Sequence, residues 1–134
     1  MPYPVECFLV DDDIDDQEIF SLALQELGPS IRCVVANDGI QALKKLNDDH
    51  SFIPDYIFMD VNMPRMNGIQ CLAEIKKTPH IRHVPVYIYS TSADPEMMTK
   101  SKLLGAADFI VKPPSITLLS QTLAQLFERK RKDP

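Results

Sequence analysis

Short apolar runs alternate with helix-length segments along this chain of 134 residues. The runs have the length of strands, and each is followed by a segment with room for a helix: residues 7–10, 33–36, 56–59, 84–89 and 109–111. Parallel strands that are buried on both faces are continuously apolar, because helices cover both sides of the sheet. The alternation therefore predicts an α/β fold with a parallel sheet and right-handed crossovers.

The expected helices have recognisable signals at their ends. Apolar residues repeat at helical spacing over residues 19–27, and the repeat stops at Gly28-Pro29. The last helix begins with Ser115 as its cap, and four of its apolar side chains are predicted to be buried: Leu119, Leu123, Leu126 and Phe127. The pattern leaves no internal repeat and no linker.

The composition fits one domain that spans residues 1–134, with a core at about 5–128. A content of 45% hydrophobic and 25% charged residues is ordinary for a globular domain. The formal net charge of -5 argues against direct binding of nucleic acid by the whole surface. The short basic C-terminal run at residues 129–132 is interpreted as a last helical turn, where cations complement the helix dipole, in preference to a site for an anionic partner.

Three cysteines give an odd count without a paired spacing. Cys7 and Cys33 fall inside expected strands, where a thiol acts as a small core residue. The sequence shows neither a charged and apolar leader nor an apolar run of about 18 residues. We therefore expect a reduced, cytoplasmic protein that does not enter a membrane.

Carboxylates follow two of the expected strands. Asp11, Asp12 and Asp13 come directly after the first strand, and Asp60 comes directly after the third. In an open parallel sheet, ligands bind beyond the carboxyl ends of the strands, where the strand order reverses. For a strand order of 2-1-3-4-5, that reversal lies between the first and third strands. We expect these carboxylates to meet at this rim of the sheet.

The same rim is predicted to carry a hydroxyl and a cation, because Ser90 follows the fourth strand and Lys112 follows the fifth. Crowded carboxylates repel one another unless a cation neutralises them, and their oxygen atoms suit Mg²⁺. A lysine and a hydroxyl can stabilise the oxygens of a transferred phosphoryl group, and an aspartate can be the nucleophile that accepts it. The residues alone thus point to phosphoryl transfer onto the protein.

These motifs resemble, in order, the signature of the response-regulator receiver domains of two-component signalling. The matching features are the acidic pair Asp11-Asp12, the segment at residues 59–68, the hydroxyl of Ser90 and the pair Lys112-Pro113. The resemblance spans almost the whole chain. It implies a flavodoxin-like (CheY-like), doubly wound sheet of five parallel strands in the order 2-1-3-4-5, with helices on both faces.

The resemblance also implies roles for the residues at the phosphorylation site. Asp60 would be the phosphoacceptor, Asp12 a direct Mg²⁺ ligand and Asp11 a ligand through water. The main-chain carbonyl of Asn62 would complete the protein ligands of the ion, and Lys112 would pair with phosphoryl oxygens. The peptide bond between Lys112 and Pro113 is expected to be cis.

A conformational switch is implied by two further positions. Ser90 would close onto the phosphoryl group, and Phe109 would follow it inward. Serine and phenylalanine stand here in place of the more usual threonine and tyrosine of the family. A simple core role for Phe109 remains open.

The resemblance implies a stand-alone regulator that is not an enzyme acting on other molecules. Its partner would be a sensor histidine kinase or a histidine phosphotransfer protein, and its output would use the face of the fourth helix, fifth strand and fifth helix, by binding a downstream protein or a second copy of the chain. The loop before Pro54-Asp55 and the run Ser90-Thr91-Ser92 resemble regulators that are paired with phytochrome-like kinases.

Two other functions stay open at this point. A Mg²⁺-dependent aspartyl-phosphate phosphatase also places a nucleophilic aspartate after a strand, but its usual acid/base aspartate two residues later is Asn62 here. A receiver-shaped interaction module that is never phosphorylated is the other alternative. Asp13 would either compete for the metal or lead into the first helix, and Asp15 and Asp16 are interpreted as favourable charges at that helix's N-terminus.

Overall fold

The computed structural model describes residues 4–132, with the side chains of residues 130–132 excepted. Five strands alternate with five helices along this part of the chain: β1 (Val5–Val10), α1 (Ile14–Leu27), β2 (Ile31–Ala36), α2 (Gly39–Asp48), β3 (Tyr56–Met59), α3 (Gly68–Lys76), β4 (Val86–Ser90), α4 (Pro95–Leu103), β5 (Asp108–Val111) and α5 (Ile116–Lys132). All five predicted strands are present. The basic run at residues 129–132 continues α5, as its interpretation as a helical turn requires.

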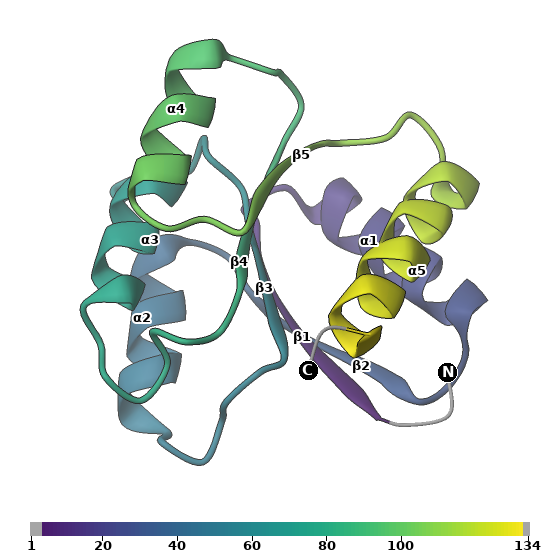
Figure 1. The fold of residues 1–134 in the computed structure, drawn as a ribbon, viewed down its shortest axis with the longest axis horizontal. Helices are drawn as coiled ribbons and strands as arrows, with labels where there is room; N and C mark the ends of the chain where they lie inside the picture. The colour runs from purple at the N-terminus through teal and green to yellow at the C-terminus, as the bar shows by residue number, and fades with distance from the viewer. Residues whose placement is uncertain (1–3, 133–134) are drawn as a thin grey trace.

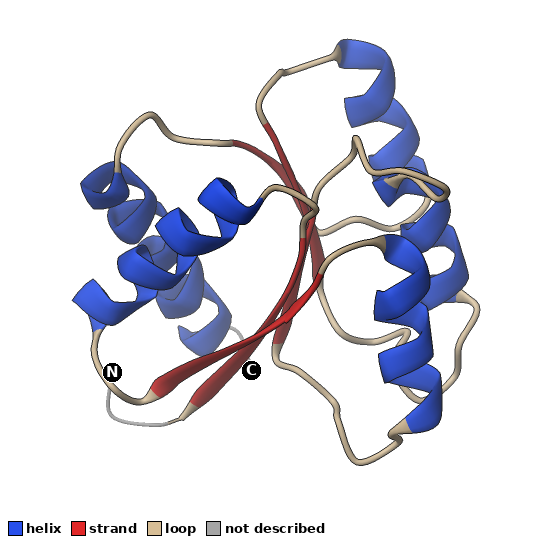
Figure 2. Ribbon diagram, turned by 180° about the vertical axis from the view of Figure 1, so that it is seen from behind, coloured by secondary structure: helices blue, strands red, loops and turns tan. Residues whose placement is uncertain are grey.

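The strands form one parallel sheet in the order β2-β1-β3-β4-β5, which confirms the predicted topology. The order reverses between β1 and β3, since the chain first moves from β1 to one side and then crosses back to the other. Helices α1 and α5 cover one face of the sheet, and α2, α3 and α4 cover the other (Figures 1 and 2). This arrangement places the predicted site at the carboxyl ends of two central, neighbouring strands.

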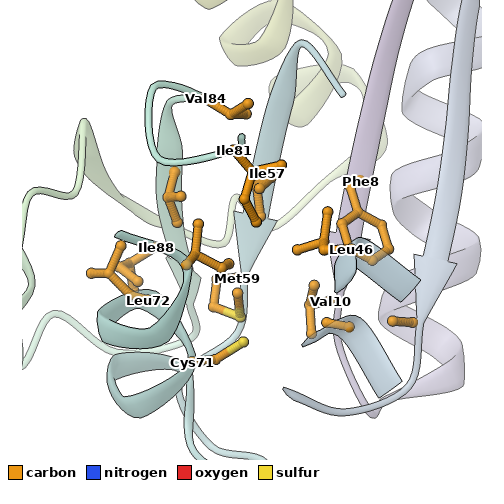
Figure 3. Close-up of a cluster of buried hydrophobic side chains, with 14 of the residues drawn as sticks. Phe8, Val10, Leu46, Ile57, Met59, Cys71, Leu72, Ile81, Val84 and Ile88 are labelled. Atoms are coloured by element: carbon orange, nitrogen blue, oxygen red, sulfur yellow. The ribbon is translucent and has the colours of Figure 1, made fainter. Parts of the chain in front are cut away.

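The two sheet faces have separate cores, to which each strand contributes alternate side chains. In β1, Phe8 and Val10 enter the core under α2, α3 and α4, whereas Cys7 and Leu9 enter the core under α1 and α5. Figure 3 shows the first of these cores, in which side chains of the sheet meet side chains of α2 and α3. The four apolar residues predicted for the last helix are all buried in the second core. Burial on both sides makes the central strands a rigid support for the residues at their ends.

Several helix boundaries follow from the side chains named in the sequence. Gly28 ends α1 with a φ of 123°, a left-handed conformation that favours glycine. Ser115 accepts a hydrogen bond from the amide of Leu118 (3.1 Å), so it caps α5 as predicted.

The prediction of a cis bond between Lys112 and Pro113 is wrong. All peptide bonds of the described residues are trans, the form that the amide intrinsically favours even before proline. In the described part of the chain, every helix is too short or too polar to cross a membrane.

Candidate functional site

Two aspartates continue the sheet one residue beyond the central strands. The amide of Asp60 donates to the carbonyl of Val10 (2.9 Å), and the amide of Asp11 donates to the carbonyl of Ala36 (3.1 Å). These bonds hold the two residues side by side at the point where the strand order reverses. Ligand atoms from Asp11, Asp12 and Asp60 all lie within 4.8 Å of one another. Asp11 and Asp60 are buried, whereas Asp12 is exposed, so the group opens to solvent on one side.

Asp13 belongs to the helix and not to this group of carboxylates. Its Oδ1 accepts a hydrogen bond from the amide of Asp16 (3.0 Å), which makes it the N-cap of α1. Its own amide donates to Oδ1 of Asp11 (3.0 Å). Of the two interpretations left open by the sequence, the structure supports the one in which Asp13 leads into the helix.

Lys112 follows the last residue of β5, and its side chain reaches the carboxylates. Its amide donates to the carbonyl of Ser90 (2.7 Å), which extends the pairing of β4 and β5 by one residue. Its Nζ lies 2.9 Å from Asp11 Oδ2, 2.7 Å from Asp16 Oδ2 and 3.7 Å from Asp60 Oδ1. The lysine side chain is only 8% exposed, and its Nζ also lies 5.1 Å from the centre of the Tyr89 ring. A buried cation is therefore fixed among three acidic groups.

Burial and mutual repulsion change the acidity of these groups. Burial raises the pKa of Asp60 to about 6; the nearby Lys112 lowers it, and the charges of Asp11 and Asp12 raise it further. Burial likewise raises the pKa of Asp11, against the hydrogen bonds it accepts. Burial lowers the pKa of Lys112, but its hydrogen bonds to Asp16 and Asp11 outweigh that effect, so the net pKa is raised. The lysine therefore stays charged, and its single positive charge does not neutralise all of the surrounding carboxylates.

The segment after Asp60 is held against it by a glycine. A Cβ atom on Gly68 would overlap the carbonyl oxygen of Asp60, so α3 can begin here only with glycine. The amide of Gly68 donates to the carbonyl of Val61 (2.9 Å), which closes the loop between them. Within this loop, Arg65 has a φ of 67° and pairs with the carboxylate of Asp38, the N-cap of α2. The loop that carries Asn62 is thus anchored at both ends.

Ser90 and Phe109 lie on either side of a small cavity beside the carboxylates. The cavity has a volume of about 60 Å³, and Val61 and Asn62 also line it. The Ser90 hydroxyl is buried and accepts only a long hydrogen bond from the amide of Ser92 (3.4 Å). Phe109 is partly buried and packs against the core under α4. The hydroxyl-bearing residue and the ring thus line the same cavity.

The structure brings most of the predicted site residues together. Asp11, Asp12, Asp60 and Lys112 form one group, and the hydroxyl, the ring and Asn62 line the adjoining cavity. Neither the contact between Asp16 and Lys112 nor the close approach of Gly68 to the Asp60 carbonyl was predicted from the sequence. One signal could have found the first, because Asp16 precedes the buried Phe20 by four residues and so shares the inward face of α1.

Comparison with known proteins gives a consistent result. Residues 7–124 match the model of the family described as "Response regulator receiver domain". The chain is 36% identical over 115 residues to the two-component response regulator ORR12 of Oryza sativa subsp. japonica, an alignment that covers 86% of this chain and 92% of that protein. ORR12 is thus a response regulator of a length similar to that of this chain.

Two solved structures of phytochrome response regulators are also similar. The phosphorylated cyanobacterial regulator RcpA superposes with a TM-score of 0.86 at 27% identity, over 98% of this chain and 96% of that one. The bacteriophytochrome regulator AtBRR superposes with a TM-score of 0.75 at 29% identity, over 94% of each chain. Both superpositions extend over nearly the whole length of each chain.

Proposed function

Since the chain belongs to the family of response regulator receiver domains, we propose that it is a phosphorylation switch in which Asp60 accepts a phosphoryl group in the presence of Mg²⁺. Receiver domains of this family act as regulators and interact with histidine kinases or phosphotransfer proteins. The observation that carries the proposal is that Asp60 belongs to an open group of three carboxylates and lies 3.7 Å from the buried ammonium group of Lys112. A nucleophile, a metal site and a counter-charge for the phosphoryl group are thus combined.

The donor set fits a hard divalent cation. Receiver domains bind Mg²⁺ at an acidic group, and the atoms offered here are carboxylate oxygens from Asp11, Asp12 and Asp60. We assign Asp12 as a direct ligand, Asp11 as a ligand through water, and the main-chain carbonyl of Asn62 as the remaining protein ligand. When bound, the ion would neutralise the carboxylates and the oxygens of the incoming phosphoryl group.

The protein's own groups have separate tasks in the transfer. Asp60 attacks as the ionised carboxylate. Its pKa is raised to about 6 in the metal-free protein, so it holds a proton more tightly than an ordinary aspartate and must release it before the attack. Lys112 contacts a phosphoryl oxygen in the product and keeps its charge because Asp11 and Asp16 hold it as an ammonium ion. Because Asp60 and Lys112 are both buried, water weakens the attraction between their charges less than it would at the surface.

We propose that the switch runs from Ser90 to Phe109. A new dianion on Asp60 would attract the buried hydroxyl, which has only one long hydrogen bond to lose. The cavity of about 60 Å³ gives the ring space to follow. Phe109 also lines a surface groove of about 460 Å³ beside Met98 and Ala106, so its movement would change the shape of that groove.

The surface of α4, β5 and α5 is our candidate for the output face. It exposes four large apolar side chains in the described part of the chain: Met98, Leu103, Val111 and Leu118. Exposed apolar groups of this kind are typical of protein-binding surfaces, and we propose a downstream protein as the partner, with a second copy of the chain as the alternative. The net charge of -5 gives no support to direct binding of nucleic acid.

A kinase of the phytochrome type is the donor that the comparisons favour, since RcpA and AtBRR are both described as phytochrome response regulators. The alignment covers 92% of ORR12, and we propose that the receiver unit described here acts as a regulator in its own right. Free thiols at Cys7, Cys33 and Cys71 agree with a reducing compartment, so we place the protein in the cytoplasm.

The proposal is tested by incubation with acetyl phosphate and Mg²⁺, followed by intact mass measurement. The wild type should gain one phosphoryl group, and this adduct should be absent from Asp60→Asn and from samples that contain EDTA. An adduct that persists in Asp60→Asn would show that a residue other than Asp60 is phosphorylated. Continuous release of phosphate from unrelated phosphoesters would instead favour the phosphatase alternative.

A further inference from the structure

Lys112 has its shortest carboxylate contact with a residue outside the proposed phosphorylation chemistry. Its Nζ lies 2.7 Å from Asp16 Oδ2 but 3.7 Å from Asp60 Oδ1. We propose that Asp16 is a positioning residue that competes with Asp60 for Lys112 and holds the lysine back before phosphorylation. This inference rests on the proposed function of Asp60.

The position of Asp16 is fixed by the start of α1. Its amide is bound by the N-cap Asp13 (3.0 Å), so its backbone cannot shift without loss of the cap. The next residue, Gln17, donates from Nε2 to the carbonyl of Asp11 (2.7 Å) and to Oδ1 of Asn37 (2.8 Å). These bonds tie the first turn of the helix to the ends of β1 and β2. Asp16 is therefore held at a set distance from the carboxylate group.

Burial distinguishes Asp16 from its acidic neighbour. The Asp16 side chain is 26% exposed and is directed to a lysine that is 8% exposed, whereas Asp15 is exposed at the surface. A charge-assisted hydrogen bond in such a partly shielded place is stronger than an ion pair in open solvent. The contact is thus strong enough to affect where the lysine rests.

The competition matters during the transfer itself. With acetyl phosphate as donor, a bond forms between an Asp60 carboxylate oxygen and phosphorus, the bond from phosphorus to the acetyl oxygen breaks, and acetate leaves with the electron pair. Lys112 stabilises the transition state when it contacts a phosphoryl oxygen at Asp60. Its Nζ now lies 3.7 Å from Asp60 Oδ1, so it must shift toward Asp60 and lengthen its contact with Asp16. An interaction that is stronger before the reaction than in its transition state raises the barrier.

Removal of the Asp16 charge should have two opposite effects. In Asp16→Asn, the lysine is free to approach Asp60, so phosphorylation by acetyl phosphate at saturating Mg²⁺ should become roughly three- to tenfold faster, the range expected for loss of one charge-assisted hydrogen bond. Mg²⁺ affinity should fall by a similar factor, since the cation of Lys112 then lies nearer the metal ligands. Asp16→Glu retains the charge and should stay closer to wild type in both measurements.

The matched control is Asp15→Asn, which makes the same change of charge one residue away on the exposed surface. We would measure Mg²⁺ affinity by titration calorimetry and the phosphorylation rate by time-resolved intact mass, with circular dichroism to show that each variant is folded. Asp16→Ser is the second neutral variant for use if Asp16→Asn folds poorly. Asp15→Asn should change both quantities by less than about twofold, as expected for a screened surface charge.

Weaker Mg²⁺ binding together with faster phosphorylation in Asp16→Asn, but not in Asp15→Asn, would support the competition. Equal behaviour of the two variants would overturn it and leave the function of Asp60 intact. Slower phosphorylation in Asp16→Asn would also overturn it, because Asp16 would then assist the lysine. A wild type that gains no phosphoryl group would contradict the proposed function itself, and the inference with it.

Discussion

Replacement of Asp60 by asparagine is expected to stabilise the metal-free protein at pH 8. Burial raises the pKa of Asp60 from an ordinary value of 3.8 to about 6, so the folded protein holds this proton more tightly than the unfolded chain does. The stability that comes from the protonated carboxyl is fully present below about pH 4 and is lost as the pH rises through 6. Above that pH, the folded state contains a poorly solvated carboxylate, which asparagine does not.

The size of the effect follows from the two pKa values. One pH unit corresponds to about 1.36 kcal/mol, so the interval between 3.8 and about 6 is worth about 3 kcal/mol at most. The Asp60 side chain is 10% exposed, which leaves little room for solvent screening to reduce that value. We therefore expect Asp60→Asn to raise the free energy of unfolding by about 2 to 3 kcal/mol at pH 8 in EDTA, and by almost nothing at pH 4.

The assay is urea unfolding at both pH values, followed by circular dichroism because the chain contains no tryptophan. Saturating Mg²⁺ should reverse the order at pH 8, since a ligand that binds only the folded state stabilises the wild type and not the variant without the carboxylate. An asparagine variant that is equally stable or less stable than wild type at pH 8 in EDTA would refute the reasoning about crowded carboxylates.

Three further variants test the close contact of Gly68 with Asp60, the positive charge of Lys112 and the proposed switch at Ser90. Gly68→Ala should destabilise the fold by about 1 to 3 kcal/mol and slow phosphorylation, because the new methyl group overlaps the Asp60 carbonyl; a fully stable, active variant in urea unfolding and phosphorylation assays would show that α3 can shift freely. Lys112→Ala should be phosphorylated roughly a hundredfold more slowly and should lose phosphorylation-dependent association, as measured by intact mass and size-exclusion chromatography; normal association would show that the lysine is not needed. Ser90→Ala should accept phosphate on Asp60 but show smaller amide chemical-shift changes over residues 106–111; shifts equal to wild type would exclude the hydroxyl from the relay.

The strands could be predicted from the sequence because their signal is local, whereas their order was expected from the family resemblance and is confirmed by the structure. A central strand such as β3 is apolar along its whole length, as burial on both faces requires, and the residues after it are marked by Asp60 and Pro64. The same reasoning brought the carboxylates and Lys112 to one rim, since parallel strands end on the same edge. Those predictions needed no knowledge of side-chain positions.

The remaining details depend on packing that the local sequence does not contain. The spacing from Phe20 places Asp16 on the inward face of α1, but only the tertiary structure shows that it meets Lys112 there. Gly68 has the sequence character of an ordinary turn, but the structure shows that its missing side chain allows α3 to touch Asp60. The trans bond before Pro113 likewise differed from an expectation that came from the resemblance alone.

The central claim is that Asp60 itself carries the phosphoryl group, and chemical trapping tests it most directly. After incubation with acetyl phosphate and Mg²⁺, borohydride reduction converts an aspartyl phosphate to homoserine, and peptide mass spectrometry then identifies the altered residue. We expect homoserine at position 60 and unchanged aspartates at positions 11 and 12. Homoserine at one of those two positions, or at none, would contradict the claim.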